Sequence, residues 1–241
     1  MIDTPGYADF FGDTVGAITG ADCVVIVVDA VAGIQVGSRK AWKEASRLNK
    51  GRAFFINKLD RIGANFLGTV EMMRERLRAN PVILQLPVGQ GEDFADIIDL
   101  IEMKQIRWDE DSLGASYHTL EIADEYRQEA DSYREKLLEA VAEFDDDLME
   151  AYLSEELIET SRILEALRKA TVGLELVPVL CGSALRNKGI QPLLDGIVDF
   201  LPSPVDVPAI QGTHPDSGDV IECQARDADP LAALIFKVSM I

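Results

Sequence analysis

Short apolar runs alternate with amphipathic segments along most of the chain. Strand-like apolar runs occupy residues 23–29, 53–56 and 176–180. Segments with helical periodicity occupy residues 9–20, 36–48, 66–78 and 190–200. Strands that alternate with helices in this way predict an α/β fold with a mostly parallel sheet.

A different pattern interrupts this α/β repeat at residues 89–173. It predicts an antiparallel strand pair, a long helix over Ala123–Phe144, and two shorter helices near 148–153 and 161–171. Between Asp109 and Glu159 there are 18 acidic and 3 basic residues, so this span carries −15 of the net charge of −19. The acidity therefore belongs to one module, an α+β insert subdomain, and the rest of the chain is near neutral.

The last forty residues have the composition of a connector and a new domain. Pro202, Pro204 and Pro208 predict a stiff linker over residues 202–230, and residues 231–241 are typical of a first strand. We therefore expect five segments: the main domain at 1–88, the insert at 89–173, the end of the main domain at 174–201, the linker at 202–230 and the start of another domain at 231–241.

The segment Asn57-Lys58-Leu59-Asp60 follows the second apolar run directly. In an open α/β sheet, ligands bind at the carboxyl ends of the strands. There the Asp60 carboxylate can accept two N–H bonds from guanine, whereas adenine offers neither donor, so a wrong base leaves the carboxylate unsatisfied. The Lys58 stem can lie along the base, and the Asn57 amide can tie neighbouring loops together.

Two other strand-end segments stand before and after this one. Asp3-Thr4-Pro5-Gly6 suits phosphate and Mg²⁺, with Asp3 as a hard oxygen ligand acting directly or through water and Gly6 as a backbone donor that can approach a γ-phosphate. Gly182-Ser183-Ala184 offers small residues whose backbone N–H groups can reach a guanine carbonyl. The order phosphate, base, base predicts one nucleotide site.

At these residues the chain resembles translation elongation factor G. The segments that carry the resemblance are Asp3–Phe10, Asn57–Phe66, Leu77–Leu86, Cys181–Gln191 and Leu201–Ile210. The resemblance implies a P-loop GTPase domain in which the positions of Asp3 to Gly6 form switch II, those of Asn57 to Asp60 read guanine and those of Gly182 to Ala184 support the base. It also implies GTP or GDP with Mg²⁺, and the start of a β-barrel domain at 231–241.

No G-x-x-x-x-G-K-[ST] phosphate loop occurs in the chain. The family carries this loop and the switch I threonine before the segment that matches Asp3. We therefore expect the chain to be an internal fragment of a larger protein, with an incomplete P-loop GTPase domain that alone binds GTP negligibly.

Tyr7 departs from the family, which typically has histidine at this position. That histidine is thought to orient the water that attacks the γ-phosphate. A phenol can donate and accept a hydrogen bond but has no cationic form comparable to imidazolium. Tyr7 is therefore a candidate catalytic residue, and the alternative is that it only packs on the switch.

The apolar runs and the cysteines indicate the cellular compartment. No apolar run is long enough to span a bilayer, and the scattered Cys23, Cys181 and Cys223 suggest reduced thiols in the cytoplasm. The resemblance implies a monomer that works on the ribosome, with ribosomal RNA contacts through the complete protein and the stalk protein docked on the insert. The row Glu135, Glu139 and Glu143 is a candidate for that docking face or a solvated helix face. Residues 186–189 are better interpreted as a loop that leads into the final helix than as a phosphate-binding site.

The function expected from these observations is a GTP-hydrolysing elongation factor that promotes ribosomal translocation. If the protein is an enzyme of another kind, the alternative is a P-loop enzyme that uses ATP. An elongation-factor-G-like paralogue with slowed hydrolysis, acting in ribosome recycling or protection, is a second alternative. A non-hydrolysing ribosome-binding module is a third, since it needs no phosphate loop and tolerates Tyr7.

Overall fold

A four-stranded parallel sheet of order β1-β2-β8-β3 forms the central layer. The computed structural model describes residues 1–109, 112–154, 156, 158–226, 228–229 and 231–238. The strands are β1 Cys23–Asp29, β2 Gly51–Asn57, β3 Pro81–Ile83 and β8 Val177–Cys181. The expected α/β fold with a mostly parallel sheet is confirmed.

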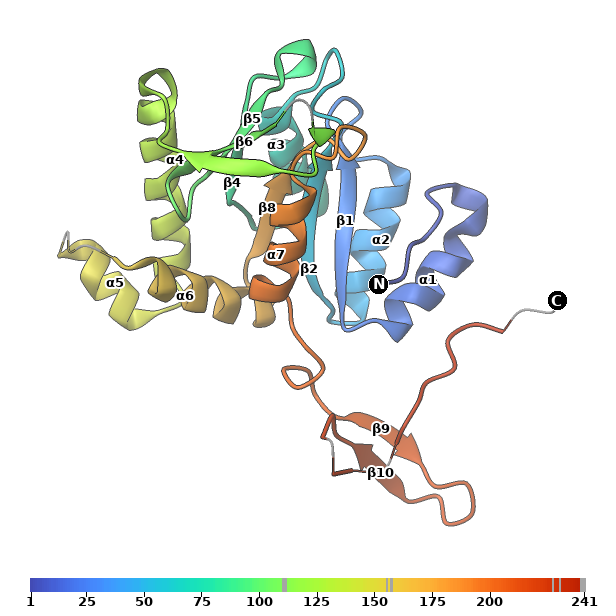
Figure 1. The fold of residues 1–241 in the computed structure, drawn as a ribbon. Coiled ribbons are helices and arrows are strands. Elements are labelled where there is room, and N and C mark those ends of the chain that lie inside the picture. Colours follow the sequence, from blue (N-terminus) through green and yellow to red (C-terminus); the bar gives the residue numbers. More distant parts are fainter. Residues whose placement is uncertain (110–111, 155, 157, 227, 230, 239–241) are drawn as a thin grey trace.

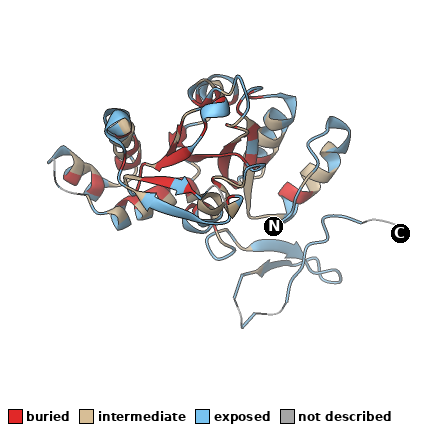
Figure 2. Ribbon diagram, turned by 45° about the horizontal axis from the view of Figure 1, so that its top comes forward, coloured by how far each residue is buried: buried red, intermediate tan, exposed pale blue. Residues whose placement is uncertain are grey.

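Helices cover both faces of this sheet (Figure 1). The helices behind it are α2 Val36–Arg47 and α3 Phe66–Leu77, and α7 Ile190–Phe200 lies in front. The period of two in β2 explains both layers, because Phe54 and Ile56 enter the main core while Phe55 packs with residues of α7. Figure 2 shows that the buried residues concentrate in these layers.

Strand β1 lies at the edge of the sheet and pairs with β2. Its apolar sequence is that of a strand buried on both faces, yet Val27 is 56% exposed. The helix α1 Phe11–Gly20, which follows the short 3₁₀ helix η1 Ala8–Phe10, packs beside α2 rather than over β1.

The insert contains a second, antiparallel sheet of order β4-β5-β6-β7. Its strands are β4 Gln85–Val88, β5 Asp96–Asp99, β6 Lys104–Trp108 and β7 Tyr117–Leu120, with the 3₁₀ helix η2 Gly91–Asp93 between the first two. The first strand of this sheet, β4, lies just before residue 89, where the insert is expected to begin. The chain changes sheets at Leu84, whose N–H donates to the Val179 carbonyl of β8 at 3.1 Å and whose carbonyl accepts from Leu100 at 2.9 Å.

Three helices complete the insert: α4 Asp124–Ala142, α5 Asp146–Leu153 and α6 Thr160–Val172. Their buried faces, which include Leu137, Val141 and Leu167, belong to the same hydrophobic cluster as Phe54 and Ile56 of the parallel sheet. The insert and the main domain therefore share one continuous core, and the insert is not an independently packed unit.

The expected linker at residues 202–230 is not irregular throughout, because it contains an antiparallel hairpin of β9 Ile210–Thr213 and β10 Val220–Cys223. The turn has the composition of a hairpin connection, with Pro215, Asp216 and Gly218 between β-branched strand residues. Gly218 takes a φ of 75° and donates its N–H to the His214 carbonyl at 3.0 Å. This signal was present in the sequence.

The strand expected at residues 231–241 is not formed over 231–238, and residues 239–241 lie outside the described part of the chain. The segment lies against α1 instead of pairing with another strand. A Cβ added to Gly20 of α1 would lie only 2.8 Å from the Phe236 ring. The Lys237 Nζ lies 3.0 Å from an Asp13 carboxylate oxygen. Strand geometry needs a paired neighbour, which the described residues do not supply.

No helix in the part of the chain that the structure describes combines the length and apolar character needed to cross a bilayer.

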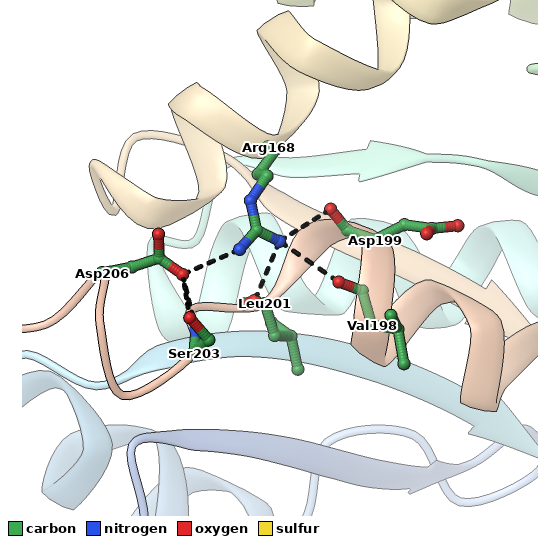
Figure 3. A network of polar contacts seen from close by, with 6 residues as sticks. All are labelled: Arg168, Val198, Asp199, Leu201, Ser203 and Asp206. Atoms are coloured by element: carbon green, nitrogen blue, oxygen red, sulfur yellow. Dashed lines mark hydrogen bonds and ion pairs between the residues drawn. The ribbon is translucent and has the colours of Figure 1, made fainter. Parts of the chain in front are cut away.

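A single arginine fixes the end of α7 and the start of the segment that follows (Figure 3). Arg168 of α6 donates from Nη1 to the carbonyls of Val198, Asp199 and Leu201 at 3.2, 3.0 and 3.2 Å. Its Nη2 donates to Asp206 at 2.7 Å. A cation at a helix C-terminus satisfies carbonyls that have no partner within the helix.

We expect Arg168→Ala to lower the free energy of unfolding by about 1–2 kcal/mol, because charge-assisted bonds are lost from a partly exposed position. Urea denaturation followed by circular dichroism measures this change. Arg168→Lys keeps the charge but not the planar fork, and should recover only part of the loss. Arg162→Ala, an exposed arginine on the same helix, is the control and should change stability by no more than about 0.5 kcal/mol; an equal effect of both alanine variants would contradict the assignment.

Candidate functional site

Two loops emerge side by side from the carboxyl ends of β2 and β8. These strands are parallel neighbours, with Phe54 opposite Val179 and Ile56 opposite Cys181. The residues that follow, Asn57–Asp60 and Gly182–Ala184, are therefore brought together although more than a hundred residues separate them in sequence. This is the edge at which α/β sheets bind ligands.

Asn57 joins the two loops through its side chain. Its Oδ1 accepts the N–H of Lys58 at 2.8 Å and the N–H of Ala184 at 2.9 Å. Two backbone bonds reinforce the junction, since Leu59 donates to the Gly182 carbonyl at 3.2 Å and Gly182 donates to the Ile56 carbonyl at 2.9 Å. The loops therefore form one hydrogen-bonded unit.

The backbone donors of the second loop are all engaged within the protein. Gly182 and Ala184 bond to the first loop as described, and Ser183 exchanges backbone bonds with Lys188, at 2.9 Å as donor and 3.0 Å as acceptor. A guanine carbonyl that bonds to this loop would therefore share or replace one of these bonds. The cause is the tight closure of the loop on itself.

That closure explains the glycines at its two ends. A Cβ on Gly182 would lie 2.3 Å from the Lys188 carbonyl oxygen and 3.0 Å from the Phe55 ring. Gly189 has a φ of 84°, and a Cβ there would lie 2.3 Å from the Cys181 carbonyl oxygen. Neither position has space for a side chain, so the sequence of this loop is dictated by backbone approach.

Lys58 reaches across the end of the sheet to Asp29 at the end of β1. Its backbone is left-handed, with a φ of 65°, and its Nζ lies 2.6 Å from the Asp29 Oδ2. Asp29 Oδ1 accepts the N–H groups of Val31 and Ala32 at 2.8 and 3.2 Å. Burial alone would raise the pKa of Asp29, but the bonds from Lys58, Val31 and Ala32 hold that pKa below its ordinary value.

Asp60 faces the other loop. Its side chain is only 10% exposed, and its Oδ2 lies 3.4 Å from the Nε of Arg186. A carboxylate this well covered needs a partner, and the Arg186 guanidinium supplies one. The loop at 186–189 does lead into α7, as expected, but Arg186 adds an ion pair that the sequence alone did not reveal. Predicting this ion pair requires knowledge of the register of β2 against β8.

Residues 3–7 lie apart from these loops. They precede α1, where the Gly6 carbonyl oxygen would be 3.7 Å from a Cβ on Gly37 of α2. Asp3, Pro5 and Gly6 are exposed, Thr4 is half-buried, and Tyr7 is 78% exposed. In the described part of the chain, no hydrogen bond or ion pair joins residues 3–7 to the loops at Asn57–Asp60 and Gly182–Ala184.

Tyr7 contributes to local structure through its backbone. Its carbonyl accepts the N–H of Phe10 at 3.1 Å, which closes the first turn of η1. The described residues contain no group of three or more His, Cys, Asp or Glu side chains arranged to hold a metal ion. Asp3 fits Mg²⁺ as a single hard oxygen donor, since Mg²⁺ on nucleotides commonly takes one or two carboxylates, with phosphates and water supplying the other ligands.

The comparisons with known proteins agree with this geometry. The fold and its strand-end loops define a nucleotide-binding α/β domain, and the sequence signature described as "Elongation factor Tu GTP binding domain" matches residues 1–203. The chain therefore belongs to the elongation factor Tu GTP-binding domain family, a family of GTP-binding translation factors.

A solved structure supports the same relationship. The crystal structure of the protein called ttk003000868, from Thermus thermophilus, is 33% identical in sequence, with a TM-score of 0.76. The match covers 85% of this chain and 30% of that one, so this chain spans less than a third of the length of its relative.

The Asp29–Lys58 pair gives a prediction on pH. In Asp29→Asn the amide oxygen can keep the two backbone bonds, but the ion pair is lost. Because the folded pKa of Asp29 is depressed, the stabilisation by the pair is present above the unfolded pKa, about 4, and is lost as the pH falls through the folded pKa. At pH 7 the free energy of unfolding of the parent should exceed that of the variant by about 1 kcal/mol, after allowance for solvent screening.

Urea denaturation at several pH values from 7 to 3 measures the difference, which should shrink as the pH falls. Asp195→Asn, at an exposed position on α7, is the matched control and should show little difference at neutral pH. A parent-to-variant difference for Asp29 that stays constant over the whole pH range would contradict the ion pair.

Proposed function

We propose that this chain is the guanine-reading part of a ribosome-dependent translational GTPase of the elongation factor G type. The single observation that supports it most is the junction at Asn57, which places Lys58, Asp60 and Ala184 together at the carboxyl edge of the sheet. Membership in a family of GTP-binding translation factors supports the same activity. The complete factor would bind GTP and GDP and promote translocation in the cytoplasm, as a monomer.

Recognition of guanine rests on Asp60 in this proposal. Its two carboxylate oxygens accept the N1–H and the exocyclic amine of guanine, and the Arg186 guanidinium lies beside the carboxylate at 3.4 Å. Lys58, pinned to Asp29 by its amine, offers its methylene stem to the face of the base. Gly182, Ser183 and Ala184 form the wall opposite, where the Ala184 N–H is shared between Asn57 and the base carbonyl.

The phosphate end of the site is assigned to Asp3, Thr4, Pro5 and Gly6. Asp3 would hold Mg²⁺ through water, and the Gly6 N–H would contact the γ-phosphate. Bound Mg²⁺ would neutralise phosphate charge during transfer. Asp3, Pro5 and Gly6 are exposed, so they are accessible to a phosphate and its metal ion.

The acidic insert is the proposed docking face for the ribosomal stalk protein. Glu135 and Glu139 are exposed on one face of α4, and the exposed Glu143 follows directly as its C-terminal cap residue. A row of like charges slightly weakens the helix, which is tolerated where a basic partner compensates it. Contacts with ribosomal RNA would come through the complete protein.

Two other functions remain compatible with the same residues. Tyr7 in place of the family histidine favours an elongation-factor-G-like paralogue with slowed hydrolysis, acting in ribosome recycling or protection. A non-hydrolysing ribosome-binding module is favoured by the acidic insert alone. Salt-sensitive binding to ribosomes without nucleotide would indicate the module, whereas strict dependence on GTP would indicate the switch.

Asp60→Asn in the complete protein should weaken GTP binding and favour xanthosine triphosphate. An asparagine amide donates a hydrogen bond to the carbonyl that xanthine carries in place of the 2-amino group. We expect GTP affinity to fall about 10–100-fold, since an unpaired buried polar group costs about 1–3 kcal/mol. Calorimetric titration with both nucleotides measures the switch, with Asp216→Asn in the exposed hairpin turn as control. Unchanged GTP affinity in the Asp60 variant would remove the guanine assignment.

Tyr7→Phe in the complete protein separates a catalytic hydroxyl from a packing role. If the hydroxyl positions water, hydrolysis on ribosomes should slow while GTP affinity stays nearly unchanged, because only a transition-state contact is lost. We expect Tyr7→His to raise the rate, since imidazole places its nitrogen nearer the backbone. Single-turnover rates on ribosomes measure both variants, and equal rates for all three proteins would exclude Tyr7 from the mechanism.

A further inference from the structure

The insert contacts the loop of Asp60 through η2 and the residue before it. Gly91 of η2 donates its N–H to the Leu59 carbonyl at 2.7 Å. Its φ is 68°, and a Cβ there would lie 3.5 Å from the Arg61 carbonyl oxygen. The preceding Gln90 accepts the N–H of Phe66, the first residue of α3, at 2.9 Å. The loop from Leu59 to Phe66 is thus anchored at both ends by one turn of the insert.

The second base-reading loop is supported in the same way by the turn between β6 and β7. Gly114 in this turn has a φ of 80°, and a Cβ there would lie 2.6 Å from the Arg186 carbonyl oxygen and 2.7 Å from the Asn187 Cβ. The Gly114 carbonyl accepts the side-chain amide of Gln191 at 2.8 Å. The backbone of the insert therefore lies directly against the residue whose guanidinium pairs with Asp60.

Two further bonds tie this loop and the start of α7 to the insert. Lys188 donates from Nζ to the Ala95 carbonyl, just before β5, at 2.7 Å. The Trp108 indole N–H of β6 points at the Gln191 Oε1 at 3.4 Å, and Trp108 itself is buried. Each loop thus has separate attachments to the insert, in addition to the Asn57 junction that connects the loops to each other.

We propose that the insert positions the guanine-reading loops, with Gly91, Gly114 and Gln191 as positioning residues. This inference rests on the proposed guanine specificity of Asp60. Recognition by a carboxylate needs two bonds of good geometry, so a small displacement of either loop weakens both. The insert is then a structural part of the nucleotide site, and whatever docks on its outer face acts on elements that also hold Asp60 and Arg186.

The decisive variant is Gly114→Ala in the complete protein. Its control is Gly218→Ala, because both glycines have a similar positive φ, 80° and 75°, but a Cβ on Gly218 would have no neighbour within 4 Å. Both substitutions introduce similar backbone strain, but only the Cβ of Gly114→Ala would clash with residues 186 and 187. Calorimetric titrations with GDP and with inosine diphosphate, which lacks the 2-amino group, measure affinity and selectivity, and thermal unfolding measures stability.

We expect Gly114→Ala to bind GDP at least about tenfold more weakly than the parent, while Gly218→Ala binds it normally. The preference for GDP over inosine diphosphate should fall in the same variant, a change that a loss of stability alone does not produce. Parent-like GDP affinity and selectivity in Gly114→Ala overturn the inference. Failure of the parent itself to bind GDP overturns the proposed function, and the inference with it.

Gln191→Ala keeps the test decisive if Gly114→Ala does not fold. It removes the bond to the Gly114 carbonyl without backbone strain, and we expect GDP affinity to fall about threefold with a reduced preference over inosine diphosphate. Gln211→Ala, which removes an exposed side-chain bond to Glu222 in the hairpin, is its control. Equal affinities and selectivities of the two glutamine variants overturn the inference.

Discussion

The parallel pairing of β2 with β8, closed by the Asn57 side chain, is the constraint on which the rest of the site depends. This pairing places two loops from distant parts of the sequence at the same sheet edge, and the Asn57 Oδ1 then accepts one N–H from each. Lys58, Asp60 and the Gly182–Ala184 segment take their positions from this junction. Without it, no single loop would present enough polar groups to read a base.

The insert shares in the same construction although its charge and sheet type are different. Its antiparallel strands begin where the chain leaves the parallel sheet at Leu84, and its helices bury their apolar faces in the same core as β2. The acidic residues of α4 lie on the outer side of this packing. One module therefore carries both a solvent-facing charged surface and contacts with the two strand-end loops, through the bond from Gly91 to Leu59 and the close approach of Gly114 to Arg186.

The sequence predicted the elements better than their connections. The apolar run of β2 and the helical stripe of α3 are local signals, so their bounds agree with the structure within a few residues. The junction at Asn57 followed from strand-end placement. The pair between Asp60 and Arg186 could not be predicted, because it depends on the β2–β8 register. The strand expected at 231–241 is not formed over 231–238, since apolar alternation does not supply a partner strand. The hairpin turn at Gly218 has a typical turn sequence but was not predicted.

Amide hydrogen exchange of the complete protein, with and without GDP, tests the central claim most directly. If the two strand-end loops and the insert turns form one unit around the proposed base site, GDP should slow exchange together in four segments: 57–61, 91–93, 112–116 and 182–189. The N–H groups of Leu59, Gly91, Gly182 and Ala184, which are bonded in this structure, should show the largest common change. Protection confined to 57–61 and 182–184, with the insert turns unaffected, would contradict the account.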